Sequence, residues 1–341
     1  MKRKNLWVRA AILITAAAVM MGAALLILQR IDSTQYQETR TAMTEGFGQL
    51  KTVTVDGVTY QEKPDVMTML LAGIDRPIRE DAEEGSAATN YRDGGQADFL
   101  LLLAIDHTDK KIHQLQIDRD TMTEIDILGI FGNEVGTRTE QICLSHRYGA
   151  TARDNAKYTI RAVERLLGGM QIDGYYMIDY SSMALLNDAL DGITVNIDFD
   201  MTSINPEWTA GSRVTLRNKE AEQFVRSRMT IGEGTNAERM IRQNEFMKNA
   251  IAVLKKKTRE DLSFGENLLR QLEKQSVTNM TIRWLEEELS QSVDYQTLSV
   301  EYLPGEYEVG WEGYMEFHME EGAAAAWVLK HLYTVLEMAE G

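Results

Sequence analysis

Apolar residues in this chain gather in short continuous runs, and three of these runs predict neighbouring strands. Val66 to Ile74 and Phe99 to Ile105 are almost uninterrupted apolar segments, a pattern typical of strands buried on both faces. Ile112 to Ile117 follows the second run after a turn from Asp106 to Lys111. Because this turn is too short for a crossover, the runs on either side of it are expected to form an antiparallel hairpin.

Apolar spacings of three and four indicate helices between further strand-like runs. Asn155 to Leu167 shows this spacing and stops at Gly168 and Gly169, a glycine signal for the end of a helix. Strands that alternate with helices predict an α/β domain with a central mixed β-sheet flanked by helices. The remaining expected elements are a short helix or strand pair near 50–60, strands at Tyr175–Ile178, Ile193–Ile197 and Leu298–Leu303, helices at Ser181–Leu190, Lys219–Phe224, Thr235–Lys257, within 262–288 and at Gly322–Met338, and an irregular stretch over 121–150.

The N-terminus predicts a membrane anchor. Ala10 to Leu28 is a charge-free, mostly apolar run that would span about 28 Å as a helix, close to the hydrocarbon thickness of a bilayer. Basic residues precede the run, so the positive-inside rule places the N-terminus in the cytoplasm. A cleaved signal peptide is the alternative, but no small-x-small cleavage site follows the run. The expected organisation is a single-pass cell-membrane protein with a cytoplasmic tail at 1–9, a transmembrane helix at 10–28, a juxtamembrane spacer at 29–63 and one extracellular domain at 64–341.

Composition limits the ligands that this domain can take. The net charge of the chain is −16, and such a surface repels nucleic acid, which needs a basic face to displace counterions. An anionic ligand must therefore meet a local basic pocket. Cys143 is the single cysteine, so neither an intrachain disulfide nor a CxxC metal site is possible. No spacing typical of a metal site connects the histidines His107, His113, His146 and His318.

The predicted hairpin brings charged residues together at its open end. Pairing Ile105 with Ile112 and stepping outwards along both strands places Asp98 opposite Arg119, with Asp120 next to it. Two carboxylates and a guanidinium at the end of a buried strand form a candidate site for a divalent cation and a phosphate, because Mg²⁺ prefers carboxylate oxygens and bridges to phosphate oxygens. A surface salt-bridge cluster is the alternative interpretation.

A second cluster of charge begins the helix predicted from Thr235. The sequence from Thr235 to Glu238 fits a capping box. Arg239, Arg242 and Gln243 then fall on one face of the helix by spacings of three and four. Arg239 and Gln243 are expected at the edge between core and solvent, near the positive end of the helix dipole, where an anion is favoured.

Arg226 and Arg228 lie shortly before this helix. If the chain from Phe224 to Arg228 is extended, both arginines point the same way; if it is helical, they diverge. The planar fork of arginine suits phosphate oxygens better than the point charge of lysine does. Together with Arg239, Arg242 and Gln243 they indicate a phosphate site, whereas a solvated charged face is the alternative.

These motifs resemble the LytR-CpsA-Psr family of cell-wall glycopolymer ligases. The resemblance covers most of the chain, from the single N-terminal anchor onwards. The arginine-aspartate-threonine motif and the later arginine-x-x-arginine-glutamine motif are its most specific parts. The matching segments are Leu70–Arg76, Ala97–Phe99, Asp118–Thr121, Gly192–Val195, Phe224–Arg228 and Arg239–Gln243.

What the resemblance implies is a hydrophobic cavity for a polyprenyl tail, with the diphosphate and a Mg²⁺ ion at its mouth. Asp98, Arg119 and Asp120 would be catalytic, and the two aspartates would also hold the metal. The residues implied in pyrophosphate binding are Asp75, Arg226, Arg228, Arg239, Arg242 and Gln243. The chain departs from the family pattern at three places: Gln96 replaces an arginine, Asn236 an aspartate and Gln141 a lysine.

The implied function is transfer of a glycan phosphate from a polyprenyl-pyrophosphate carrier to a hydroxyl of peptidoglycan, as in the attachment of teichoic acid or capsule. Three other functions stay open from the sequence. The domain could bind a polyprenyl phosphate without turnover, or hydrolyse a polyprenyl pyrophosphate. A transcriptional regulator is disfavoured by the negative charge, by the expected location outside the cell and by the lack of a helix-turn-helix signal.

Overall fold

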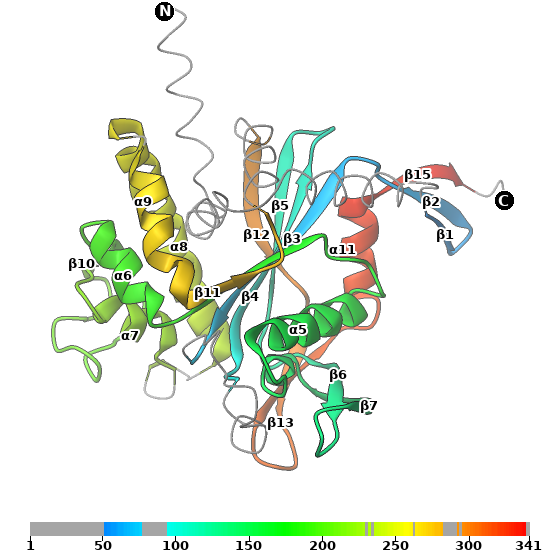
Figure 1. Ribbon diagram of the computed structural model, residues 1–341, viewed down its shortest axis with the longest axis horizontal. Helices are drawn as coiled ribbons and strands as arrows, with labels where there is room; N and C mark the ends of the chain where they lie inside the picture. The colour runs from blue at the N-terminus through cyan, green and yellow to red at the C-terminus, as the bar shows by residue number, and fades with distance from the viewer. Residues whose placement is uncertain are drawn as a thin grey trace, which may run out of the picture.

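The computed structural model describes residues 51–76, 94–228, 231–232, 235–261, 263–281, 292 and 295–338. Its centre is a six-stranded sheet in the order β11-β8-β3-β4-β5-β12, seen nearly edge-on in Figure 1. These strands are β3 (Val66–Ile74), β4 (Ala97–Asp106), β5 (Lys111–Ile117), β8 (Gly174–Asp179), β11 (Ser276–Thr278) and β12 (Gln296–Tyr302). The predicted α/β class with a central mixed sheet is confirmed.

The sheet mixes both strand directions, and its middle is the predicted hairpin. β4 is antiparallel to β3 and to β5, while β8 runs parallel to β3 and β12 parallel to β5. Ile105 pairs with Ile112 and Leu100 with Ile117. The predicted register is therefore correct, and the open end of the hairpin lies beyond Leu100 and Ile117.

Helices cover both faces of the sheet, because alternate side chains of its buried strands point to opposite sides. In β4, Leu101 and Leu103 belong to one buried cluster, and Leu100 and Leu102 to the other. The first cluster, on what we call the α8 face, includes residues of α6 (Ser182–Ala189), α7 (Glu220–Arg226), α8 (Asn236–Glu260) and α9 (Ser263–Leu272). The second, on the α11 face, includes residues of α5 (Ala152–Leu166) and α11 (Ala323–Leu332).

Smaller sheets surround this core, and one of them corrects the sequence prediction for residues 121–150. Two strands, β6 (Met122–Leu128) and β7 (Glu134–Gln141), form a hairpin there, followed by the 3₁₀ helix η2 (Ile142–His146). β7 is mostly exposed, so no apolar pattern marked it. Two further pairs of strands are β9 (Thr194–Asn196) with β10 (Arg213–Thr215), and β13 (Gly305–Val309) with β14 (Met315–Met319).

The C-terminal segment also differs from the prediction of one helix over Gly322–Met338. α11 ends at Leu332, and Tyr333 adopts an extended conformation. The following strand β15 (Tyr333–Met338) pairs with β2 (Val58–Glu62), which also pairs with β1 (Thr52–Val55). The pair β1–β2 is one of the two alternatives, helix or strand pair, that the sequence left open near 50–60, and its C-terminal partner was not predicted. Within 262–288 only α9, the 3₁₀ helix η3 (Glu273–Gln275) and β11 are described.

The predicted transmembrane segment, Ala10 to Leu28, and the juxtamembrane residues up to 50 lie outside the described residues. In the part of the chain that the structure describes, none of the helices combines the length and the apolar character needed to cross a bilayer.

Candidate active site at the open end of the hairpin

A β-bulge places Asp98 at the end of β4. Gly73 pairs with Phe99 and Ile74 pairs with Ala97, so Asp98 is the additional residue on its strand. Such an insertion breaks the alternation of faces and redirects a side chain, often beside a functional site. Asp98 is 7% exposed, and burial of a carboxylate requires charged or hydrogen-bonding partners.

A tight turn after β5 presents Arg119 and Asp120. The carbonyl of Asp118 accepts a hydrogen bond from the backbone N–H of Thr121 at 3.1 Å and another from its hydroxyl. Asp118 Oδ1 also accepts from the N–H of Asp120 at 2.8 Å. Aspartate at the first position of a turn commonly makes this side-chain bond, so the sequence from Asp118 to Thr121 determines where the two functional side chains lie.

The start of α8 completes the site from the other side. Thr235 caps this helix by accepting from the N–H of Glu238 at 3.3 Å, as predicted. Arg239 is 3% exposed, deeper than the predicted boundary position between core and solvent. Asn236 Oδ1 accepts from Arg239 Nε at 2.9 Å and from its Nη2, which fixes the direction of the guanidinium.

Three arginines contact Asp98 and Asp120, and one of them, Arg119, contacts both. Arg119 Nη1 lies 2.6 Å from Asp98 Oδ1, and its Nε lies 3.3 Å from Asp120 Oδ1. Arg239 Nη1 donates to Asp98 Oδ2 at 3.1 Å. Arg228 Nη2 lies 3.1 Å from Asp120 Oδ2. The mouth of the hairpin and the start of α8 therefore face each other, as the single site implied by the family resemblance requires.

Arg226 and Arg228 diverge, which answers the question left open by their spacing. α7 ends at Arg226, and Ser227 is extended. Arg228 reaches Asp120, whereas Arg226 pairs with Glu222 at 2.6 Å and lies over the ring of Tyr180. Burial acts to lower the pKa of Arg226, but Glu222 and the charge of Asp98 raise it, as expected for a guanidinium close to the site.

Arg242 takes a structural position rather than joining the arginine–aspartate contacts. Its Nε donates to the carbonyl of Phe224 at 3.2 Å, and its Nη2 donates to the carbonyl of Ser227. These carbonyls belong to the C-terminal end of α7, which lacks intrahelical donors. Burial lowers the pKa of Arg242 to about 10. Arg242 thus joins α7 to α8 and helps to position Arg226 and Arg228.

Asp75 and Gln96 support the site from the loop that precedes β4. Asp75 Oδ1 accepts from the N–H of Gln96 at 2.6 Å. Gln96 Oε1 in turn accepts from Arg119 Nη2 at 2.5 Å. Asp75 therefore acts on Arg119 through Gln96 in this structure, while its predicted contact with a pyrophosphate stays a prediction.

An apolar cavity opens next to these charged groups, on the α8 face. Gln243 connects the cavity to the site: its Nε2 donates to Tyr180 Oη at 2.9 Å, and its Oε1 accepts from Gln116 at 3.2 Å. The lining residues are Ala72, Gly73, Phe99, Ile178, Tyr180, Met183, Val225, Gln243, Phe246 and Met247.

Burial and charge act in opposite directions on the ionisable groups of the site. Burial raises the pKa of Asp120 above its usual value, although Arg119 and Arg228 act to lower it. Burial acts to lower the pKa of Arg119, but Cys143, Asp98 and Asp120 raise it further than burial lowers it. Arg119 is thus a permanent cation, while Asp120 is the carboxylate that binds a proton more readily than usual.

A family comparison now decides the relationship that the motifs suggested. The model described as the LytR_cpsA_psr family matches residues 31–328. The chain belongs to the LytR_cpsA_psr family. All three departures from the family pattern are accommodated by hydrogen bonds, since Gln96 accepts from Arg119, Asn236 holds Arg239, and Gln141 Nε2 donates to the carbonyl of Met315.

Relatives within the family are similar over part of their length. The polyisoprenyl-teichoic acid–peptidoglycan teichoic acid transferase TagU of Halalkalibacterium halodurans is 29% identical over 170 residues, 50% of this chain and 47% of the relative. The TagU of Bacillus cereus is 26% identical over 220 residues, 64% of this chain and 62% of the relative. Biofilm regulatory protein A of Streptococcus mutans is 28% identical over 177 residues, 50% of this chain and 39% of the relative. The chain spans about half the length of the curated relatives it matches.

Solved structures of LytR_cpsA_psr proteins share the fold at lower identity. TagV of B. subtilis superposes with a TM-score of 0.54 at 20% identity, over 79% of this chain and 98% of that one. Protein gbs0355 of Streptococcus agalactiae gives 0.60 at 18% identity, over 81% and 92%. A structure of TagT bound to LI-WTA gives 0.55 at 17% identity, over 79% and 91%.

The structure adds site residues that the sequence reasoning missed. Tyr180 lines the cavity and binds Gln243, and the hydroxyl of Tyr307 donates to Asp118 beneath the turn. Cys143 Sγ lies 2.8 Å from Arg119 Nη2. Gln116 is buried among apolar neighbours of β5, and this polar interruption of a buried strand was the one signal available in the sequence.

The carboxylates present fit the magnesium ion that the LytR_cpsA_psr resemblance implies. Asp98 Oδ1 and Asp120 Oδ2 are both buried, and neither accepts a hydrogen bond from the described residues; each instead lies beside a guanidinium. Mg²⁺ is commonly held by one or two carboxylates together with substrate phosphates. Asp98 and Asp120 provide this set of hard oxygen donors.

Proposed function

We propose that this protein transfers a glycan phosphate from a polyprenyl-pyrophosphate carrier to a hydroxyl of peptidoglycan, forming a phosphodiester. The observation that carries the proposal is the position of the arginine–aspartate cluster directly beside an apolar cavity. Phe99 and Gln243 line the cavity, Asp98 precedes Phe99 in the chain, and Arg239 lies one helical turn before Gln243. A ligand that suits both parts carries a long apolar chain with an anionic group at its end.

The arginines supply the binding energy for the anionic group. Arg119, Arg228 and Arg239 already contact carboxylates in the ligand-free protein. Guanidinium groups make bidentate contacts with phosphate oxygens, and an incoming diphosphate competes with the carboxylates for the same donors. Their direction is fixed beforehand by Asn236 and Gln96, so little reorganisation is needed when charge develops on the transferring phosphorus.

The transfer itself balances without a covalent intermediate on the protein. The acceptor hydroxyl oxygen attacks the phosphorus that carries the glycan, the bond between that phosphorus and the bridging oxygen breaks, and polyprenyl phosphate leaves. The proton of the hydroxyl passes to Asp98 or Asp120. Asp120 is suited to this role because burial raises the pKa of its carboxyl. A Mg²⁺ ion held by Asp98 and Asp120 would neutralise charge on the bridging and leaving oxygens.

Names of relatives support this choice of donor and acceptor. Several of them are named as polyisoprenyl-teichoic acid–peptidoglycan teichoic acid transferases, which are proteins that join a lipid-linked polymer to the cell wall. We extend this reaction class to the present chain, together with the location of its domain outside the cell membrane that the N-terminal run predicts.

The test uses full-length protein with a polyprenyl-pyrophosphate-linked glycan, Mg²⁺ and peptidoglycan. Wild type is expected to form a phosphodiester product and to release polyprenyl phosphate. Arg119→Ala and Arg239→Ala are expected to lose both product and lipid binding. Release of inorganic phosphate or free glycan phosphate without peptidoglycan would indicate a hydrolase, and lipid binding without any release would indicate a carrier. Absence of product, with both variants binding the lipid as well as wild type, would overturn the proposal.

A further inference from the structure

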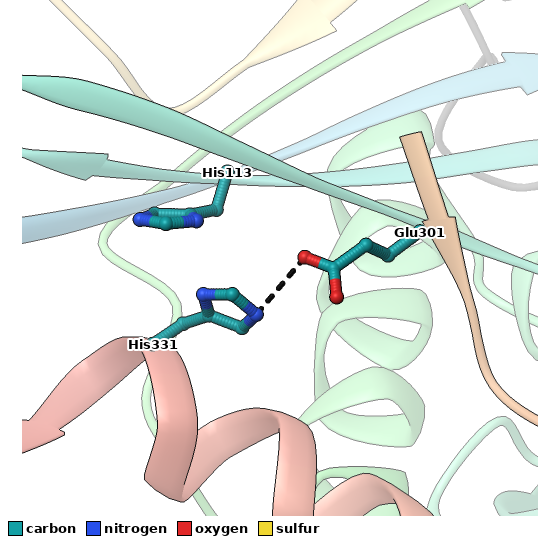
Figure 2. Close-up of side chains that lie close together, drawn as sticks. All are labelled: His113, Glu301 and His331. Atoms are coloured by element: carbon teal, nitrogen blue, oxygen red, sulfur yellow. Dashed lines mark ion pairs between the residues drawn. The ribbon is translucent and has the colours of Figure 1, made fainter. Parts of the chain in front are cut away.

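A second polar cluster lies in the core on the α11 face, away from the arginines. His113 of β5, Glu301 of β12 and His331 of α11 point toward one another (Figure 2). One ligand atom from each residue lies within 4.8 Å of the others. His113 and His331 are 8% and 3% exposed. Three separate elements therefore deliver two imidazoles and a carboxylate to one point inside the protein.

The hydrogen bonds within the cluster do not satisfy it. His331 Nε2 lies 2.9 Å from Glu301 Oε1. His113 Nδ1 is buried and has no hydrogen-bond partner among the described residues, although its ring lies only 4.2 Å from that of His331 between centroids. A buried polar atom without a partner is uncommon in native proteins and calls for an explanation such as a bound ion.

We propose that His113, Glu301 and His331 bind a divalent transition-metal ion, with zinc as the best match. Two imidazole nitrogens and one carboxylate oxygen are a known ligand set for zinc sites that keep a fourth position for water. Magnesium is disfavoured at this place, because it requires oxygen ligands. Ligand atoms of a tetrahedral zinc ion lie about 3.3 Å apart. Atoms separated by up to 4.8 Å must therefore close by as much as about 1.5 Å around the ion, while the 2.9 Å between His331 Nε2 and Glu301 Oε1 must widen slightly.

The surroundings of the cluster suit metal binding. Lys330 Nζ holds Glu301 Oε2 at 2.8 Å, which leaves Oε1 directed at His331. The side chain of Glu301 is 33% exposed, and this side gives an ion and a water molecule access from solvent.

The ion would connect the last helix to the outer strands of the sheet. β12 pairs with β5 through an irregular register between Thr297 and Val300. α11 leads directly into β15, which pairs with β2. Because 113, 301 and 331 are far apart in the sequence, a metal that joins them closes long loops, where a cross-link gains most in principle. The ion would cross-link these elements, and this role is independent of the proposed transfer reaction.

The test is metal binding by full-length protein in detergent, stripped with a chelator and titrated with ZnCl₂. Wild type is expected to bind zinc with micromolar affinity or tighter at this site. At a hundredfold excess over Kd the melting temperature is expected to rise by about 5 °C. Glu301→Gln and His331→Ala are expected to weaken binding by more than the roughly 10–100-fold that loss of an outer-shell partner costs.

A matched control separates this site from an exposed one. His318 lies within ion-pair distance of Glu308 and Glu316 on the surface of the β13–β14 hairpin. His318→Ala is expected to leave the tight zinc site and its thermal shift unchanged. Tight binding that disappears in His318→Ala and persists in His331→Ala would overturn the proposal.

Cobalt spectroscopy on wild type covers the case in which the core variants do not fold. Co²⁺ in place of zinc is expected to give intense visible absorption typical of four-coordinate sites, saturating with the affinity measured by competition with zinc. Folded wild-type protein that shows neither this absorption nor a thermal shift with Co²⁺ or Zn²⁺ contradicts the assignment.

Discussion

The hairpin β4–β5 carries two buried polar clusters with opposite chemistry. At its open end, Arg119, Arg228 and Arg239 contact Asp98 and Asp120. On the α11 face, His113 and His331 meet the single carboxylate of Glu301, and burial lowers the pKa of both imidazoles. Cations exceed anions among the contacting groups of the first cluster, which therefore suits an anionic ligand. The second offers two imidazoles and Glu301 Oε1 as donors to a cation, while Lys330 occupies the other carboxylate oxygen.

The two clusters also differ in how they are connected to the rest of the protein. The arginine–aspartate cluster borders the apolar cavity, so an occupant can reach it with a lipid chain attached. The histidine cluster lies between a strand edge and the last helix, where Lys330 and Trp327 surround it. Under the two proposals, the first cluster exchanges ligands during turnover, whereas the second holds one ion.

The largest expected effect is that of Arg119→Ala on transfer. The variant removes one guanidinium that serves both Asp98 and Asp120, so transfer should fall by about 10²–10³-fold, the usual cost of losing a donor to developing charge. The two carboxylates are left with less compensation, and unfolding should become easier by about 3–5 kcal/mol. Initial rates at a temperature where the variant stays folded, and denaturant melts, measure the two effects.

Arg165→Ala is the matched control for this change. Arg165 pairs with Asp126 at 2.8 Å, outside the site, between α5 and β6. This variant should lose some stability and keep the wild-type rate. If Arg119→Ala retained more than about a tenth of the wild-type rate, the central role of the cluster would be contradicted.

Filling the cavity should give the next largest effect. Met247 lines the cavity and is only partly buried, so Met247→Trp should occupy space that the lipid needs without breaking the core. The KM for a lipid-linked donor should rise by about tenfold, the order of a lost small apolar contact. Met247→Leu conserves volume and should be nearly neutral. A donor with a shortened prenyl chain should reduce the difference between the two variants; an unchanged difference would show that the lipid lies elsewhere.

The pH dependence of transfer should identify Asp120. Burial raises its pKa in the metal-free protein, so the acid limb of kcat/KM, which reports the free enzyme, should lie above the ordinary aspartate value of about 3.9. Arg228→Gln removes a charge that lowers this pKa and should move the limb to higher pH. A rate profile from pH 4 to 8 measures the shift. A limb that stays in place in Arg228→Gln, or moves to lower pH, would argue against Asp120 as the proton acceptor.

Ionisation of Asp120 should have the opposite effect on the stability of the fold from its effect on the rate of transfer. A carboxyl whose pKa is raised in the folded state stabilises the fold at low pH, and this contribution is lost as pH rises through the folded pKa. Asp120→Asn should therefore flatten the pH dependence of unfolding in the weakly acidic range. Transfer and stability should thus change in opposite directions as Asp120 ionises.

Removing the cap of α8 should have the smallest effect. Thr235 accepts a hydrogen bond from the N–H of Glu238, and loss of such a cap typically costs about 1 kcal/mol. Thr235→Ala should reduce stability by this amount. It should also weaken donor binding slightly, because Arg239 lies only one helical turn after the cap. Thr235→Ser should restore both. An effect on donor binding as large as that of Arg119→Ala would mean that the helix start, and not the arginines, governs the site.

The sequence predicted the first cluster because its members are close to landmarks of local structure. The register of the hairpin followed from one short turn. Helical spacing showed that Arg239, Arg242 and Gln243 lie on one side of helix α8. The depth of burial did not follow, since Arg239 was expected at the boundary and is fully covered. Arg242 was expected in the phosphate site, but it binds the end of α7, a contact that only the packing of two helices creates.

Residue spacing along the sequence could not predict the cluster of His113, Glu301 and His331. His113 and His331 are on a strand and a helix at opposite ends of the domain sequence, and Glu301 looked like one acidic residue among many. The prediction that Gly322 to Met338 forms a single helix also placed no boundary after His331. Contacts between elements that are distant in the sequence depend on topology. Here the parallel pairing of β12 with β5 brings Glu301 near His113.

The central claim is that the arginines at the mouth of the cavity hold a diphosphate on a lipid. Binding of polyprenyl diphosphate and of the matching uncharged polyprenol to full-length wild type and Arg239→Ala tests it most directly. The account predicts that wild type binds the diphosphate at least about a hundredfold tighter than the alcohol, and that Arg239→Ala loses most of this preference. Equal affinity of wild type for the two lipids, or an unchanged preference in Arg239→Ala, would contradict it.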